Sequence, residues 1–98
     1  MGSAARRKPN RLADKLLEIR LGLGLSQNGL IRQMGFTDDL TQAQISMFER
    51  GVRQPGLLIL AAYAKAANVY VEALINDDVD LPRSLPAVTK TEGIKRRR

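Results

Sequence analysis

A capping box makes one helix start in this chain more closely specified than any other. Thr41 is a good N-cap residue whose hydroxyl can accept a hydrogen bond from the N–H of Gln44, and the Gln44 side chain can accept one from the N–H of Thr41. Leu40, just before the cap, can pack against Ile45 as a hydrophobic staple and so set the angle of entry. The segment therefore predicts a helix that begins at Gln42.

The end of this helix and its two faces also follow from local sequence. Gly51 can adopt the left-handed conformation that ends a helix, so the helix should run to about Arg50. At about 100° per residue, one face is directed to the core and carries Ile45, Phe48 and Glu49. The outward face has small or uncharged residues: Gln42, Ala43, Ser46 and Met47. Glutamines can pair with base edges, which favours a DNA contact, although a solvated polar face without a function is the alternative.

A second capped segment lies just upstream. Ser26 can serve as its N-cap, Leu25 and Leu30 can form its staple, and Gly35 can end it. Two short capped helices in succession are typical of a helix-turn-helix unit.

These segments and the helix before them resemble the phage repressor and Cro (XRE-like) family of helix-turn-helix DNA-binding domains. The resemblance covers roughly Leu12 to Ile75. The matching positions are Ile19-Arg20, Gly24-Leu25-Ser26-Gln27, Ile45-Ser46, Glu49-Arg50-Gly51, Arg53 and Pro55. The resemblance implies an all-α, compact five-helix, lambda-repressor-like domain that binds double-stranded DNA as a homodimer, with its third helix in the major groove.

The same resemblance implies roles for individual residues. The expected base contacts are Gln42, Ala43 and Met47, the glutamine suited to adenine and the other two to thymine methyl groups. The expected contacts to the DNA backbone are Gln27, Ser46 and Arg53. Arg20 and Glu49 match the family's structural ion pair, which would lock the orientation of two helices.

The sequence departs from the family pattern in two places. The link from Gly35 to Thr41 is several residues longer than the usual tight turn, and an alternative N-cap at Thr37 would extend the third helix backward. Ile31 stands where the family usually has a small alanine. A larger side chain there is one reason for a longer turn.

Composition argues against an enzyme. The 98 residues include no cysteine and no histidine, which removes thiol and imidazole nucleophiles, disulfides and the usual zinc ligands. The carboxylate pairs 38–39 and 77–78 are neighbours beside turns, a poor arrangement for acid–base catalysis. We therefore expect no catalytic residues, no metal and no cofactor.

The formal charge of +6 is concentrated at the two ends of the chain. Residues 1–9 carry three basic side chains and no acidic one, and residues 81–98 carry six basic and one acidic. Residues 10–80 carry seven basic and nine acidic side chains. We therefore expect a folded domain at 10–80 between a flexible basic arm at 1–9 and a flexible basic tail at 81–98.

The remaining helices are expected at Arg11 to about Leu21, capped by Asn10, and at 57–67 and 71–75, with Asn68 as a left-handed cap between the last two. The 57–67 helix is apolar on more than one side. Its expected core stripe is Leu57, Leu60, Ala61, Ala64 and Ala67. The expected dimer interface is Ile59, Tyr63, Val71 and Ile75, with cover for the core of a monomer as the alternative.

The committed function is a sequence-specific DNA-binding regulator, most simply a repressor, in the cytoplasm. No apolar stretch approaches the length needed to cross a bilayer, so no membrane contact is expected. The competing function is an antitoxin or accessory factor that binds a partner protein through the fourth helix or the C-terminal tail. Leu81, Leu85 and Val88 could fold back onto the domain or onto such a partner.

Overall fold

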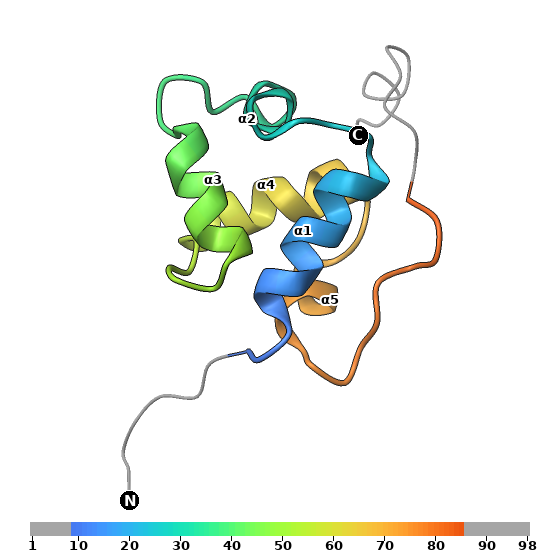
Figure 1. The fold of residues 1–98 in the computed structure, drawn as a ribbon. Helices are drawn as coiled ribbons and strands as arrows, with labels where there is room; N and C mark the ends of the chain where they lie inside the picture. The colour runs from blue at the N-terminus through green and yellow to red at the C-terminus, as the bar shows by residue number, and fades with distance from the viewer. Residues whose placement is uncertain (1–8, 86–98) are drawn as a thin grey trace, which may run out of the picture.

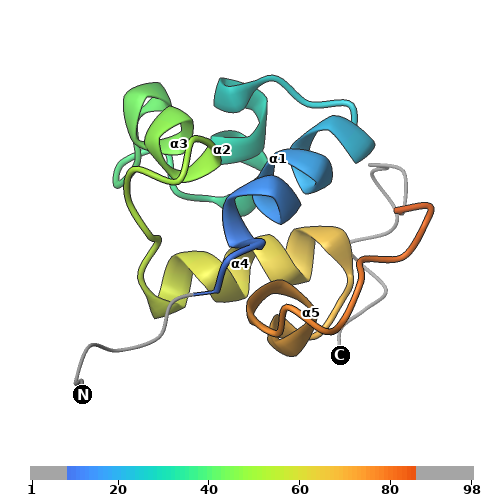
Figure 2. The same cartoon turned by 60° about the horizontal axis from the view of Figure 1, so that its bottom comes forward.

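The computed structural model describes residues 9–85 and, in that range, contains five α-helices and no strand (Figure 1). The helices are α1 (Leu12–Gly22), α2 (Gln27–Met34), α3 (Gln42–Glu49), α4 (Leu57–Ala67) and α5 (Val71–Ile75). The predicted all-α, five-helix architecture is confirmed. Figure 2 shows α2 and α3 on one side of α1 and α4 with α5 on the other, so α1 lies in the middle of the molecule.

The caps of α2 and α3 form as their sequences predict. The Ser26 hydroxyl accepts a hydrogen bond from Gly29 N at 2.9 Å, and Gly35 ends α2 in the left-handed region at φ 79°. The Thr41 hydroxyl accepts from Gln44 N at 3.3 Å, while Gln44 Oε1 accepts from Thr41 N at 2.9 Å. Both halves of the capping box are therefore present, and α3 begins at Gln42.

The long link between α2 and α3 is a turn and does not extend α3. The Phe36 carbonyl accepts hydrogen bonds from the N–H groups of Asp39 and Leu40, at 3.0 and 2.9 Å. The alternative N-cap at Thr37 is therefore wrong. Ile31 is buried in the core, 4% exposed, and Leu40 beyond the turn is buried as well.

The start of α1 differs from the prediction. Asn10 does not cap the helix; Arg11 occupies the N-cap position without a side-chain cap of its own. The carboxylate of Asp77 accepts hydrogen bonds from the backbone N–H groups of Asn10 and Arg11, at 2.9 and 3.0 Å. These two hydrogen bonds lower the pKa of Asp77, because they favour its charged form. The first helix is capped by a residue from the other end of the domain.

Lys15 strengthens the same junction from inside. Its side chain is buried, and its ammonium donates hydrogen bonds to the carbonyls of Ala73, Asn76 and Val79 at 2.8, 2.9 and 2.6 Å. A buried lysine needs such acceptors, since an unpaired ammonium would be costly to remove from water. Lys15 therefore ties α1 to the end of α5 and to the turn that follows it.

The core is formed by apolar side chains from all five helices. α1 packs against α3, α4 and α5, and α2 packs against α3 and α4. The buried apolar residues are Leu12, Leu16, Ile19, Leu23, Leu30, Ile31, Leu40, Ile45, Phe48, Leu60, Tyr63, Ala64, Ala67 and Leu74.

The prediction for α4 has to be corrected. Leu60, Ala64 and Ala67 are buried as expected, but Leu57 is 83% exposed and Ala61 is exposed. Tyr63, which was expected at a dimer interface, is fully buried in the core of its own chain and cannot contact a second copy there. Its hydroxyl has no hydrogen-bond partner among residues 9–85, and burial raises its pKa.

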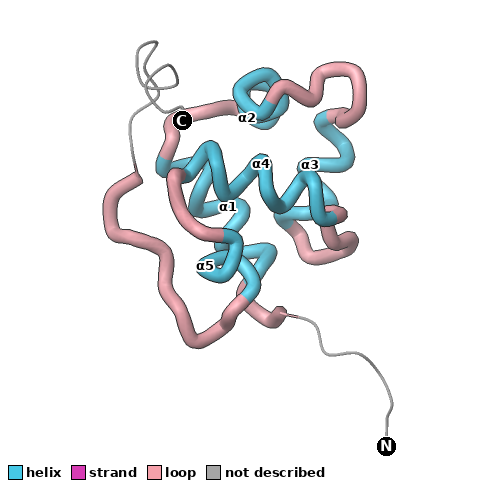
Figure 3. Tube along the Cα trace, turned by 180° about the vertical axis from the view of Figure 1, so that it is seen from behind, coloured by secondary structure: helices cyan, strands magenta, loops and turns pink. Residues whose placement is uncertain are grey.

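The predicted boundary at residue 80 is also corrected. Residues 81–85, which we call the C-terminal strap, run back along α1 (Figure 3). Leu81 and Leu85 are partly buried and pack against the core, so the folded domain extends to residue 85. Val88 lies outside the described residues. No helix in the described range has the length and apolar character that crossing a membrane requires.

Candidate nucleic-acid interface

The outer face of α3 carries the residues expected to contact bases. Gln42 and Ala43 are exposed and Met47 is half-buried, whereas Ile45 and Phe48 point into the core. The helix therefore uses alternate sides for the interior and for a partner. A face that combines an amide, a methyl group and a thioether can make both polar and apolar contacts with base edges.

Gln42 is exposed at the first turn of α3, yet its side chain is held in place. Its Nε2 donates a hydrogen bond to Oε1 of Gln27 on α2 at 3.1 Å. Nε2 of Gln27 in turn donates to Oε1 of Glu49 at 3.1 Å. These contacts connect the beginning of α2 to both ends of α3.

The structure brings Arg20 of α1 and Glu49 of α3 together as an ion pair. Arg20 Nε lies 2.7 Å from Glu49 Oε2, and Nη2 donates to Oε1 at 3.1 Å, so the contact is bidentate. The two side chains are only 15% and 6% exposed. Arg20 also donates through Nη1 to the Leu25 carbonyl at 3.0 Å, and the hydrogen bonds with Glu49 raise its pKa.

The ion pair determines how both glutamine amides are turned. A carboxylate paired with an arginine accepts hydrogen bonds and has none to donate, so Gln27 must direct its NH2 group toward Glu49. The Gln27 carbonyl oxygen then faces Gln42, which must direct its own NH2 group toward it. The Oε1 atom of Gln42 and its second N–H are left for a partner. Adenine offers one donor and one acceptor in the major groove, which matches this pair of groups.

The residues expected to contact the DNA backbone surround this face. Arg53 is exposed, and its own N–H, like that of Val52, donates to the Met47 carbonyl, which holds the loop against the end of α3. Ser46 is half-buried and its hydroxyl accepts a hydrogen bond from Arg50 Nε at 3.2 Å. Gln27 is half-buried, and one N–H of its amide remains unused by the contacts with Gln42 and Glu49.

Two features of this surface were missed in the sequence. The coupling between Gln27 and Gln42 joins residues 15 positions apart, and no local pattern indicates it. The second is Arg50, treated in the sequence only as a partner of the helix dipole. It is an exposed cation at the end of α3 and could have been suggested by its place beside the outward face.

The residues expected at a dimer interface are only partly available. Ile59 and Val71 are half-buried and pack against the core, and Ile75 is 45% exposed. The large apolar side chains that α4 does expose are Leu57 and Leu58, at 83% and 77%. Among the described residues, no group of three or more potential metal-ligating side chains lies together.

Comparison with known proteins gives the family of this fold. A family model described as helix-turn-helix matches residues 16–74, which span most of α1 and continue into α5. A search among curated protein sequences returned no match to the chain.

Proposed function

Since this chain belongs to the helix-turn-helix family of the phage repressor and Cro type, a family of DNA-binding transcription regulators, we propose that it is a sequence-specific repressor. It binds operator DNA as a homodimer with α3 in the major groove and thereby excludes polymerase. The observation that supports this most directly is Gln42, an exposed side chain whose amide is oriented by Gln27, Glu49 and Arg20.

In this proposal the base contacts come from the outer face of α3. Gln42 makes a bidentate contact with adenine through Oε1 and its free N–H. Ala43 and Met47 contact the methyl groups of neighbouring thymines. The operator half-site therefore contains A·T pairs at the positions that face the first two turns of α3.

Contacts to phosphate hold this helix in register. The free N–H of Gln27, the hydroxyl of Ser46 and the guanidinium of Arg53 border the outer face of α3. The N-terminus of α2 adds unpaired backbone N–H groups that attract a phosphate. These groups position the protein on any sequence and do not select one.

We assign the dimer contact to the exposed face of α4 and to a second copy of this chain. Leu57 and Leu58 begin α4 directly after the loop that follows α3, so this face lies next to the reading helix. Two copies that meet there have their reading helices on one side of the duplex, as two half-sites about 34 Å apart require. Polar substitutions Leu57→Ser and Leu58→Ser should produce a monomer in sedimentation experiments and abolish cooperative binding to paired half-sites. An undiminished dimer would contradict this assignment.

The experiment that tests the proposed function is selection of bound sequences from a random DNA pool, followed by affinity measurements on the enriched site. Gln42→Ala should weaken binding by about 1–3 kcal/mol and relax preference at one base pair. Arg53→Ala should weaken operator and random DNA alike. Gln33→Ala is the matched control, because Gln33 is exposed and lies about 240° around α2 from Gln27. Equal loss on operator and random DNA for Gln42→Ala would contradict the base-reading role.

The exposed apolar side chains also support a second candidate, an antitoxin or accessory factor. Leu57, Leu58 and Tyr70 are at least three-quarters exposed, a surface on which another protein could pack. The two functions differ in the selection experiment. An enriched half-site supports the repressor, whereas a pool without enrichment together with a co-purifying partner of fixed stoichiometry supports the accessory factor.

A further inference from the structure

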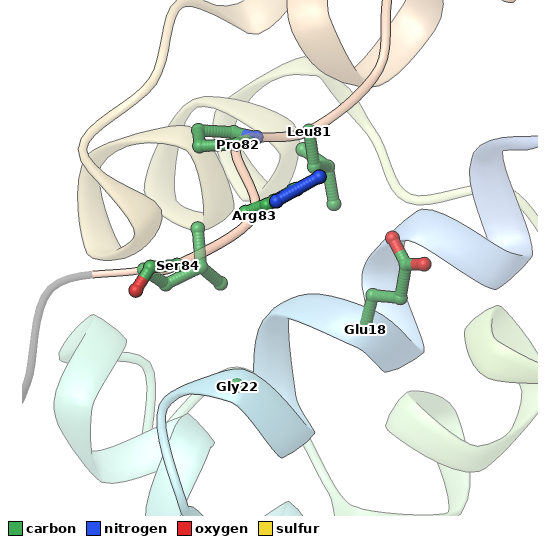
Figure 4. A pocket seen from close by; sticks show the side chains of 7 residues that line it. Glu18, Gly22, Leu81, Pro82, Arg83 and Ser84 are labelled. Atoms are coloured by element: carbon green, nitrogen blue, oxygen red, sulfur yellow. The ribbon is translucent and has the colours of Figure 1, made fainter.

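The C-terminal strap is anchored at one point near the end of α1. Leu85 lies directly over Gly22, where a Cβ atom would come within 2.9 Å of Leu85 Cδ1. Figure 4 shows Leu81, Pro82, Arg83 and Ser84 facing Glu18 and Gly22 across a small cleft. Because Leu81 and Leu85 both pack against the core, the chain leaves the folded domain at a defined position.

The cations of the chain follow this anchor. Residues 9–85 carry eight basic and nine acidic side chains, so the folded domain itself is close to neutral. Residues 86–98 carry five basic side chains and one acidic one. A nearly neutral domain gains little from general attraction to a polyanion, so the place where the basic segment emerges matters for binding.

The anchor lies close to the start of α2. Gly22 is the last residue of α1, and Gln27, the first residue of α2, follows five positions later, so the two are at most about 18 Å apart. Lys90 follows Leu85 by the same five positions and has the same maximal reach. The opposite end of α1 is held to the end of α5 by Asp77 and Lys15. The eight residues before Pro9 therefore begin at the other end of this helix.

We propose that residues 86–98 bind the DNA backbone outside the half-site, on the side of α2 and away from the centre of the operator. The strap is the positioning element, since Leu81 and Leu85 fix where the basic segment begins. Its ligand is the phosphate of flanking DNA and is independent of sequence. This inference rests on the proposed function, because it takes the start of α2 to lie beside the DNA backbone.

The absence of cysteine from the chain allows a direct test. Thr91→Cys in the full-length protein creates one thiol to which an iron chelate can be attached, and strand cleavage then reports where residue 91 lies on the selected operator. Two matched proteins provide position markers: Asn28→Cys in the first turn of α2 and Gln54→Cys in the loop after α3, both exposed positions. Cleavage from residue 91 should coincide with the Asn28 marker or lie further outward. Cleavage at the Gln54 marker, or spread evenly along the duplex, would overturn the proposal.

Two further variants test the anchor and the charges separately. Leu85→Ser in the Thr91→Cys protein should spread the cleavage pattern while the thermal unfolding curve stays cooperative; an unchanged pattern would show that the strap does not position the segment. Replacing the five cations of 86–98 by glutamine should lower the salt dependence of binding. Each lost phosphate contact should reduce the slope by about 0.9, or about 3.5-fold in affinity between 50 and 200 mM salt. An unchanged slope would contradict the proposed contact.

The same data separate this inference from the proposed function. A protected operator core with cleavage from residue 91 in the wrong place would refute the inference and leave the repressor intact. No protection of any duplex at low salt would refute both.

Discussion

Replacing Glu49 by glutamine should destabilise the domain strongly, because it leaves the Arg20 guanidinium without its anion. Both side chains are largely buried, and removal of one partner from such a pair costs about 3–5 kcal/mol. Arg20 is still 15% exposed and keeps its hydrogen bond to the Leu25 carbonyl, so we expect the lower end, about 3 kcal/mol. For a domain of this size that corresponds to a fall in Tm of about 12–24 °C.

Replacing both members of the pair by methionine should restore most of this stability. Apolar side chains of similar volume commonly substitute for a buried ion pair without net loss. The Leu25 carbonyl would still lose its donor, which costs about 1 kcal/mol. We therefore expect the Arg20→Met, Glu49→Met double variant to be about 2 kcal/mol more stable than Glu49→Gln.

The double variant should nevertheless bind the operator less well. Without the carboxylate of Glu49, nothing fixes the Gln27 amide, and Gln42 then has to be immobilised when it meets the base. Ordering one such side chain costs about 0.5–1.5 kcal/mol, or about 2- to 12-fold in affinity. Binding to random DNA should not change, because no phosphate contact is removed.

Urea unfolding and fluorescence anisotropy with operator and random duplexes measure these effects. Glu72→Gln is the matched control, since Glu72 is exposed and its replacement should change stability by less than about 0.5 kcal/mol. The reasoning would be refuted by a double variant as unstable as Glu49→Gln. It would also be refuted by a stable double variant that discriminates operator from random DNA as well as the original protein does.

Three further substitutions test other contacts, each by urea unfolding. Lys15→Met should cost about 3 kcal/mol, because three backbone carbonyls lose a buried donor, whereas Lys65→Met on the exposed side of α4 should change little; equal effects would contradict the role given to Lys15. Tyr63→Phe should stabilise the domain by about 1 kcal/mol, since it removes a buried hydroxyl that has no partner among residues 9–85, and a loss of stability would mean that the hydroxyl is bonded. Asp77 has its pKa lowered on folding, so it contributes stability above its unfolded pKa, and that contribution disappears as pH falls through the folded value; Asp77→Asn should therefore flatten the loss of stability between about pH 5 and pH 2, and an unaltered acid limb would contradict this.

The caps show why part of this fold is readable from sequence. The contacts of Ser26 with Gly29 and of Thr41 with Gln44 join residues three positions apart, so the side chain and the N–H that it caps are close whatever the rest of the chain does. The left-handed backbone of Asn68, at φ 59°, follows from the same local chemistry. The bounds of α2, α3, α4 and α5 were therefore predicted closely.

The first helix shows where local reasoning fails. Asn10 is a suitable cap by residue type, yet the N–H groups at this end are bonded by Asp77, which is 66 positions from Arg11. Lys15 would be assigned to the surface by its charge, and only the carbonyls at the end of α5 make its burial possible. No pattern within α1 indicates either partner.

By itself, the sequence determined where the helices begin and end and which residues α3 presents outward, because both depend on atoms within one or two helical turns. Tertiary structure decided the buried side of α4, where Tyr63 is internal and Leu57 is exposed. On a helix that is apolar almost all round, periodicity cannot choose a face, and the choice comes from the neighbours that pack against it. It also decided that Gln42 is oriented through Gln27 by an ion pair between α1 and α3, since the atoms involved come from three helices and meet only in the folded chain.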